Sequence, residues 1–430
     1  MATFRRELGW LDGAALTVTA VLGSGILYLP ALTASLAGPG ALIAWAGMGL
    51  LSGCFALTFL HLSVRRPDAG GIAAFAGSAF GPAARLTAGW YFLGALPIGG
   101  PVAALIGVDY MGAVLPLSHL EEGVFAVGLF GIAITLNWLG VSFSGRAAGI
   151  VMAAVSALLL VSVVANIGRV RAPAFHPFLP HGLGPVGLSA ALLFWAYVGW
   201  EAVAHYAEEF RDVKRDLPRS LLVSVILIVA LYLAVEWVTL GTGAFGAGRT
   251  QVSLALVMGD AFGAAGRVVM AVFALLICYG TIHTYMGSQA RLVYALARSG
   301  DFAPYFNHLN ARTGTPTRAL GWLFLVFVLV LAADLWGGVS LESLLGWSAG
   351  LFIGLYALAM AAGVRLLRGR SQRVTAAIGL AASLAVLPFL GWAALLTVAI
   401  AGMAVWWQRR RAGGSVPAPA GDTPGVPAPR

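Results

Sequence analysis

The sequence predicts an all-α integral membrane protein with twelve transmembrane helices. Of its 430 residues, 60% are hydrophobic and only 10% carry a charge, and the mean hydropathy is +0.88. A soluble protein of this length could not cover its surface with so few charged residues. The apolar residues also fall into successive runs of about 20 residues, the length that a helix needs to cross a bilayer.

The twelve runs follow one another with no water-soluble domain inserted between them. They lie at residues 13–36, 41–64, 86–108, 122–140, 147–168, 188–207, 218–241, 266–290, 318–335, 343–364, 374–389 and 391–408. The first run is already a full span and no cleavage site follows it, so no cleavable signal peptide is expected. Residues 1–12 are predicted to be a cytoplasmic N-terminus. The Gly-, Pro- and Ala-rich residues 409–430 are predicted to be a disordered cytoplasmic tail.

The positive charges predict the orientation in the membrane. With the N-terminus in the cytoplasm, 22 of the 26 Lys and Arg residues fall in cytoplasmic segments, and only Arg169, Arg171, Arg249 and Arg267 face the other side. This bias predicts a multi-pass protein of the cell (inner) membrane with both termini in the cytoplasm. It also explains the net charge of +9 without a nucleic-acid partner.

The sequence contains no pattern typical of an enzyme or a metalloprotein. The two cysteines both lie within apolar runs, so neither a disulfide framework nor a metal site is expected. There is no nucleophile–base pair, paired catalytic carboxylates or phosphate-binding glycine loop. We therefore predict no enzymatic activity, no cofactor and no metal. The expected surroundings are the lipid bilayer, and the sequence indicates no protein partner.

The first apolar run is interrupted by Gly23-Ser24-Gly25, with Pro30 following. Each glycine costs about 1 kcal/mol relative to alanine inside a helix, so the helix is predicted to open here. Open backbone within a bilayer is tolerated only where it is buried in protein or lines a cavity. The freed N–H groups of residues 23–26, at the positive end of a half-helix, suit a carboxylate. The alternative is a close helix–helix crossing of small residues.

The sixth run contains a second interruption, Phe194 to Glu201, with Gly199 at mid-span. Trp195 and Tyr197 are candidates to close over a substrate, although aromatic residues in a span more often serve packing or interfacial anchoring. Two interrupted helices at corresponding places predict two inverted five-helix repeats with a binding site between them. These repeats are predicted at 13–168 and 188–364, with two accessory helices at 374–408.

Three of the ionisable residues within predicted spans are considered for a role at the site. Glu201 is a candidate for gating or proton coupling, because a buried carboxyl is costly unless it has a function. Its alternative is a neutral carboxyl that is hydrogen-bonded to backbone freed by the break. Glu236 lies nearer the outer end of its span and is expected to reach water. His283, in a polar run of the eighth span, is a candidate for the cavity or for a buried packing partner.

The third span carries Gly94 to Pro101, with Pro97 and Pro101, and is predicted to be another disrupted helix that lines the same cavity. Several motifs then occur in order along the chain. They are Gly23-Ser24-Gly25-Ile26, Pro67-Asp68-Ala69-Gly70-Gly71 with Ala79-Phe80-Gly81, Phe194 to Glu201, and Ser288-Gln289-Ala290-Arg291 with Ala297-Arg298-Ser299-Gly300. On these motifs the chain resembles the amino acid–polyamine–organocation (APC) superfamily. Gly89-Trp90 with residues 97–101, and Glu201 through Phe210, resemble more narrowly the bacterial exporters of L-methionine and branched-chain amino acids.

This resemblance runs from about residue 5 to residue 408 and implies a leucine-transporter-type fold with alternating access. It implies that the substrate carboxylate binds the backbone around Ser24–Ile26 and that the amine binds carbonyls near Trp195–Val198. Trp195 matches an aromatic gate of the superfamily, whereas His283 departs from the gating aromatic found near its position in some members. Some proton-coupled members carry a lysine in the fifth span, and this chain has none there.

The expected substrate is a neutral apolar amino acid. The side-chain pocket implied by the resemblance is formed by Val21, Leu27, Ile98 and Val198, which suit methionine, leucine, isoleucine or valine. We therefore predict a secondary transporter, an exporter of such amino acids, with protons as the candidate coupling ion. The alternatives are a proton-coupled importer or exchanger, and a membrane sensor that keeps the fold without transporting.

Overall fold

The computed structural model describes residues 9–65, 71–139, 145–201, 210–246, 252–298 and 300–414. Every regular element within these ranges is a helix. Seven helical segments in this part of the chain are long and apolar enough to cross a membrane: Gly25–Arg65, Pro82–Gly112, His119–Trp138, Asp216–Thr242, Ser253–Arg298, Leu341–Leu366 and Arg370–Leu390. The predicted class, an all-helical membrane protein, is confirmed. Motif residues 67–70, 202–209 and 299, together with residues 1–8 and 415–430, lie outside the described ranges.

The first predicted span forms two helices, α1 (Trp10–Val21) and α2 (Gly25–Ala37), followed by the short turn η1 (Gly38–Gly40) and by α3 (Ala41–Arg65). The sixth span begins as α8 (Gly184–Leu193), which stops in the middle of its apolar run. The remaining α-helices within the described ranges are α4 (Gly71–Phe80), α5 (Pro82–Gly112), α6 (His119–Trp138), α7 (Gly145–Asn166), α10 (Asp216–Thr242), α11 (Ser253–Arg298), α12 (Thr317–Gly337), α13 (Leu341–Leu366), α14 (Arg370–Val386) and α15 (Trp392–Gly414).

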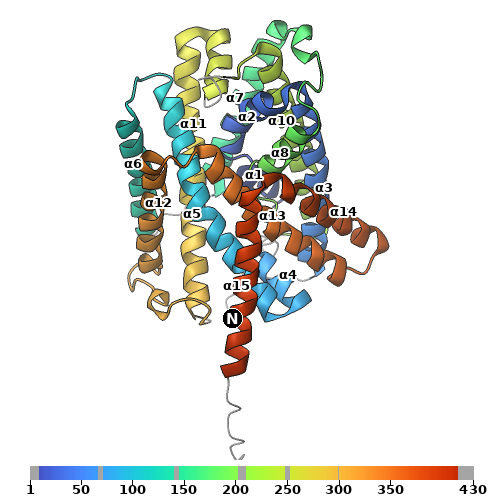
Figure 1. Cartoon of the computed structure of the whole chain (residues 1–430), viewed down its shortest axis with the longest axis vertical. Coiled ribbons are helices and arrows are strands. Elements are labelled where there is room, and N and C mark those ends of the chain that lie inside the picture. Colours follow the sequence, from blue (N-terminus) through green and yellow to red (C-terminus); the bar gives the residue numbers. More distant parts are fainter. Residues whose placement is uncertain are drawn as a thin grey trace, which may run out of the picture.

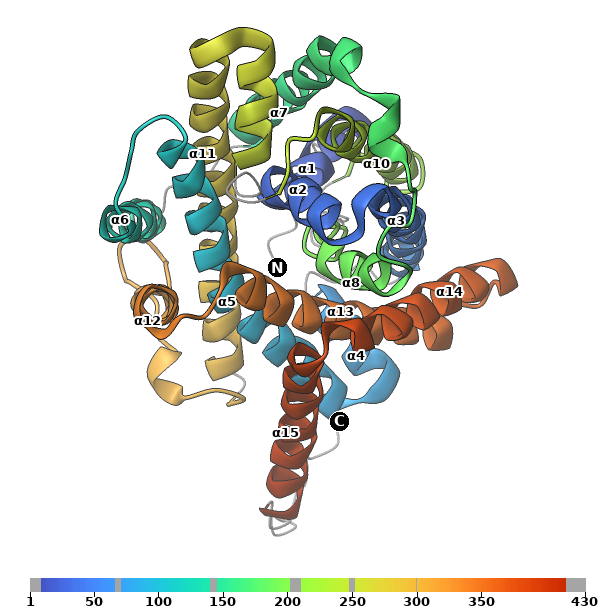
Figure 2. The same ribbon diagram turned by 45° about the horizontal axis from the view of Figure 1, so that its top comes forward.

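The helices surround the interrupted segments. Figure 1 shows α1, α2, α3, α8 and α10 grouped together, while α6 and α12 lie side by side along another edge. The helices α5 and α11 pack against each other between these two groups, and α13 crosses in front of α5. In Figure 2, α14 and α15 project from the periphery, with α15 near the C-terminal end of the described chain. The interruptions are therefore enclosed by protein, as broken backbone in a bilayer requires.

Helix α5 continues without interruption through Pro97 and Pro101, so the expectation of a disrupted third helix is wrong. Pro97 has no N–H group to donate to the carbonyl of Leu93, four residues earlier. The side-chain amide of Gln289 in α11 replaces this donor, at 3.0 Å from the Leu93 oxygen and 3.2 Å from the Phe92 oxygen. The neighbouring helix thus satisfies the backbone that the proline leaves open.

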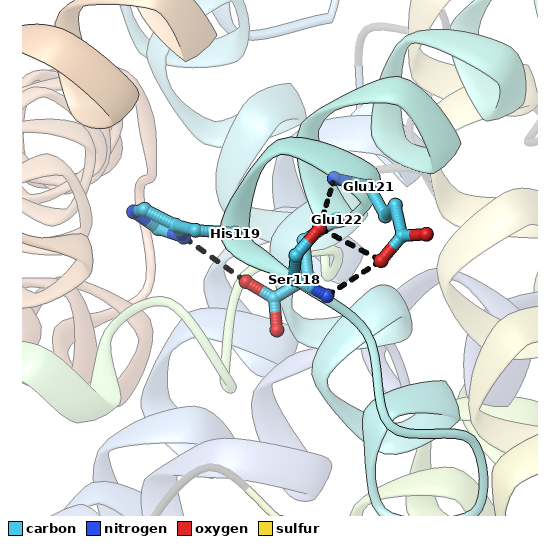
Figure 3. A network of polar contacts seen from close by, with 4 residues as sticks. All are labelled: Ser118, His119, Glu121 and Glu122. Atoms are coloured by element: carbon cyan, nitrogen blue, oxygen red, sulfur yellow. Dashed lines mark hydrogen bonds and ion pairs between the residues drawn. The ribbon is translucent and has the colours of Figure 1, made fainter.

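Helix α6 begins at a polar cap (Figure 3). The backbone N–H and hydroxyl of Ser118 both lie 2.7 Å from the Glu121 carboxylate, and the Glu121 N–H donates back to the Ser118 hydroxyl at 3.4 Å. One residue further along, His119 Nδ1 lies 3.1 Å from the Glu122 carboxylate. This capping box satisfies backbone groups that an α-helix leaves unpaired at its start, and it separates the polar loop from the apolar run.

Candidate functional site

The interruption of the first span occupies Leu22 to Ser24. Leu22 leaves the helical conformation at ψ 76°, and the Gly23 N–H bonds the Val21 carbonyl at 2.9 Å. Helix α2 then starts afresh at Gly25. The first N–H groups of a helix have no carbonyl partner within that helix, and the helix dipole adds positive partial charge at the same end. The start of α2 therefore favours a negative ligand group.

The interruption of the sixth span begins where α8 ends. Bonds between residues three apart tighten the chain, from the Trp195 N–H to the Leu192 carbonyl at 3.1 Å and from the Ala196 N–H to the Leu193 carbonyl at 3.0 Å. The chain then turns at Gly199, whose φ of +124° is a conformation that residues with a Cβ rarely adopt. The helix thus stops at the position where the sequence predicts a break.

The two interruptions pack directly on each other. A Cβ added to Gly25 would lie 2.8 Å from the Cα of Ala196, and one added to Gly199 would lie 2.5 Å from the carbonyl oxygen of Ala20. Tyr232 of α10 joins the same two segments, because its hydroxyl lies 3.0 Å from the Val21 carbonyl and 3.1 Å from the Ala196 carbonyl. Glycine is required at both contacts because no side chain fits.

A small cavity lies between the interruptions, with about 340 Å³ of space that includes its open mouth. Its lining comes from α1, α2, α5, α11, α13 and the turn after α8: Ala20, Val21, Gly23, Ser24, Gly25, Leu96, Trp195, Val198, Thr281, Tyr285 and Phe352. The polar groups in this set are the hydroxyls of Ser24, Thr281 and Tyr285 and the Trp195 indole. None of the lining side chains carries a charge, and most are apolar.

The indole of Trp195 lies between several elements of the site. Its Nε1–H donates to the Ser24 hydroxyl at 3.3 Å, and its ring lies 6.1 Å from that of Phe352 in an edge-on arrangement. A Cβ on Gly99 would come within 2.4 Å of the indole, so this glycine of α5 makes room for the ring. Trp195 thereby ties the turn after α8 to α2 and α13.

The structure brings together half of the residues predicted for the site. Val21, Gly23, Ser24, Gly25, Trp195 and Val198 line the cavity, whereas Ile26, Leu27, Ile98, Tyr197, Gly199 and His283 do not. Tyr197 instead donates to the Trp45 carbonyl at 3.1 Å and packs on the ring of Tyr232. Gly199 acts through the close contact with α1 described above.

The polar run of α11 contributes through a different face from the one expected. Thr281 and Tyr285, four residues apart, share a helix face and line the cavity. His283 lies between them in sequence and therefore faces away, where its Nδ1 and its carbonyl oxygen each lie 3.1 Å from the amide nitrogen of Asn137 in α6. Leu96 lies in the segment 94–101 that the sequence predicts to line the cavity. Sequence reasoning missed Ala20 and Phe352, because apolar residues of a packed span carry no local mark of a cavity.

Glu201 is 5% exposed and lies behind the turn rather than in the cavity. Its Oε2 accepts a hydrogen bond from the Gly199 N–H at 3.0 Å and a short one from the Tyr356 hydroxyl of α13. The Gly199 N–H also lies 3.1 Å from the Tyr356 oxygen. The carboxyl thus accepts a hydrogen bond from a backbone N–H group that the break has freed. This contact corresponds to the alternative in which Glu201 supports the interrupted backbone rather than gating the cavity.

Glu236 does not reach water, contrary to the expectation from its place near the end of its span. Its exposed fraction is 0%, because α2 and α3 cover this face of α10. Its polar contact is with the Thr33 hydroxyl at 3.5 Å. The residue belongs to a buried polar group next to the site.

An all-helical membrane protein with a central cavity between two interrupted helices has an organisation typical of secondary transporters. Comparison with known proteins agrees with this class. The amino acid permease family matches residues 8–420, and the chain belongs to this family. The resemblance to the APC superfamily is thereby confirmed, and the family implies amino acid substrates rather than enzymatic activity.

Two similar proteins align over nearly their full lengths, and a third aligns over a shorter part. The chain is 35% identical to the uncharacterized amino acid permease YecA of Bacillus subtilis, over 95% of this chain and 97% of that protein. It is 31% identical to the L-methionine/branched-chain amino acid exporter YjeH of Escherichia coli, over 96% and 98% of the two chains. It is 26% identical to the branched-chain amino acid permease BcaP of Bacillus subtilis, over 75% and 73%.

Proposed function

We propose that the protein is a secondary transporter that exports neutral apolar amino acids, methionine and branched-chain residues, by alternating access. The observation that carries this proposal is the cavity between the two interruptions, which combines a helix start on one side with apolar walls on the others. Similarity to one relative named as an exporter of these amino acids and to another named as a branched-chain permease supports the substrate class.

In this proposal the substrate carboxylate binds the first N–H groups of α2 and the Ser24 hydroxyl. The ammonium group binds carbonyl oxygens in the turn after α8, between Trp195 and Val198. Carboxylates suit helix starts, and cations suit carbonyl groups freed from a helix. Since Trp195 already donates to Ser24, its indole leaves this hydroxyl when the carboxylate arrives, and the ring then closes over the ligand.

The apolar lining of the cavity favours an uncharged side chain. Val21, Leu96, Val198 and Phe352 surround the space, and no acidic residue in the lining is available to pair with a cationic side chain. Burying a charged side chain without a partner is costly. Arginine and lysine are therefore expected to be poor substrates.

The proposed mechanism uses twelve spans, with inverted repeats at 13–168 and 188–364, two accessory helices at 374–408 and both termini in the cytoplasm. The cytoplasmic excess of Lys and Arg in the sequence supports this orientation. The mutual packing of the breaks supports a site between the repeats, because motion of one repeat against the other then opens the cavity to either side.

The test uses purified full-length protein in liposomes loaded with radiolabelled L-methionine, L-leucine or L-arginine. Efflux is followed with and without an imposed pH gradient. Saturable efflux of methionine and leucine, but not arginine, is expected. A gradient-driven flux supports proton-coupled export, and a flux indifferent to the gradient supports an exchanger. Flux of none of the three would contradict the transporter assignment and favour a membrane sensor of the same fold.

A further inference from the structure

We propose that Glu236 is a proton-binding site whose occupancy allows α2, α3 and α10 to close around it. The carboxyl group is fully buried at the contact of these helices. It lies outside the cavity lining and has no role in the substrate contacts proposed above. The effect of this proton on transport rests on the proposed function, whereas the proton binding itself does not.

Few hydrogen-bond donors are available to stabilise a charged Glu236 carboxylate. The Thr33 hydroxyl donates its single proton to the Leu29 carbonyl at 2.8 Å, and its oxygen accepts from the Trp45 indole at 3.0 Å. The same hydroxyl lies 3.5 Å from Glu236 Oε1, at the limit of hydrogen-bond distance, and can donate to the carboxyl only by leaving the Leu29 carbonyl. In the part of the chain that the structure describes, Oε2 has no hydrogen-bond partner, and neither has the hydroxyl of Thr239.

No cation in the described part of the chain compensates a negative charge at this position. Among the described residues, no Lys, Arg or His nitrogen forms an ion pair with Glu236, and the side chains that interact with it are Thr33 and Trp45. The nearby titratable groups are the phenols of Tyr197 and Tyr232. Neither α2 nor α3 presents a charged side chain to it. Enclosing an unpaired carboxylate is costly, so closure of these helices favours proton uptake and hydration favours release.

The same residues connect Glu236 to both interruptions. Trp45 packs on Tyr232 with ring centroids 5.3 Å apart, and its carbonyl accepts from Tyr197 in the turn after α8. Tyr232, one turn before Glu236 on α10, bonds the carbonyls at the end of α1 and in that turn. A change in the packing of α10 against α2 is therefore transmitted to both breaks. In the proposed orientation this end of α10 faces the outside.

The direct test is infrared spectroscopy of the purified full-length protein. The carbonyl stretching band of a protonated carboxylic acid is expected at neutral pH in the wild type and to disappear as the pH is raised. Glu236→Gln is expected to remove the Glu236 contribution to this band, seen in the difference spectrum between wild type and variant, whereas Glu342→Gln, which alters an exposed carboxyl at the start of α13, leaves the band unchanged. Glu236→Asp retains a titrating carboxyl and serves as the second variant if the glutamine variant folds poorly.

The transport test measures methionine efflux from liposomes against external pH. Wild-type flux is expected to fall with rising pH, with at most about a tenfold change per pH unit for a single proton. Glu236→Gln mimics the neutral form and is expected to keep the low-pH rate at all pH values. A band that is unchanged in Glu236→Gln, or an unchanged pH profile in that variant, overturns the inference. If no variant transports, the proposed function fails, while the infrared titration still decides whether Glu236 binds a proton.

Discussion

Gly25 at the start of α2 lies in direct contact with Ala196 in the turn after α8, so that a Cβ at Gly25 would come within 2.8 Å of the Ala196 Cα and 2.9 Å of its Cβ. Gly23, two residues earlier in the same interruption, has room, because its Cβ would lie 3.5 Å from the Thr281 hydroxyl. Both glycines line the cavity. A substitution at Gly25 therefore tests the packing of the two breaks on each other, whereas a substitution at Gly23 tests the lining of the cavity alone.

We expect Gly25→Ala to reduce both folded yield and transport, because the overlap with Ala196 costs about 1–3 kcal/mol. Gly23→Ala is expected to fold normally and to raise the KM for methionine by narrowing the cavity. Thermal unfolding in detergent and efflux from liposomes measure the two effects. Equal stability of the two variants would contradict the close contact.

Gly199 has a φ of +124° and lies against the Ala20 carbonyl. Gly199→Ala is expected to lower the free energy of unfolding by at least about 1–3 kcal/mol, since both the backbone conformation and the space oppose a Cβ. Gly280→Ala in α11 is the matched control, because no atom lies within 4 Å of the added Cβ. Alanine there is expected to stabilise the helix by up to about 1 kcal/mol. A Gly199→Ala variant as stable as this control would rule out the proposed strain.

The hydrogen bond from Trp195 to Ser24 is testable by a double-mutant cycle. Trp195→Phe keeps an aromatic ring but removes the donor, and Ser24→Ala removes the acceptor. Each change is expected to cost about 1 kcal/mol, with a coupling of about 0.5 kcal/mol or more when the two are combined. Denaturant or thermal unfolding supplies the free energies. Strict additivity would mean that the 3.3 Å contact contributes nothing to stability.

Gln289 and Pro97 form a second testable pair. Gln289→Leu leaves the Leu93 carbonyl without the donor that replaces the missing proline N–H, at an expected cost of about 1 kcal/mol. In a Pro97→Ala background the backbone N–H of the introduced alanine bonds the Leu93 carbonyl within the helix, so the same substitution is expected to cost less. The comparison of the two Gln289→Leu effects isolates this role. An identical loss in both backgrounds would assign Gln289 to packing alone.

Part of the site could be predicted from the sequence because a glycine weakens a helix at its own position, whatever its neighbours in space are. The run Gly23-Ser24-Gly25 and the isolated Gly199 mark places where a helix is weak, and the structure interrupts both helices there. Pro97 and Pro101 also mark weak places, yet α5 continues through them. The difference lies in Gln289, almost 200 residues away in the sequence, whose contact no local pattern reveals.

By itself, the sequence determined the membrane class, the succession of apolar helices and the two points at which helices break, because these depend on composition and on the backbone preferences of single residues. Only the tertiary structure decided which faces meet. It turned Thr281 and Tyr285 toward the cavity and His283 away from it, held Glu201 behind the turn, and buried Glu236 under α2 and α3. In a chain that is apolar on nearly every face, hydrophobic periodicity does not distinguish lipid from protein, so the packing of neighbouring helices fixes the orientation of each side chain.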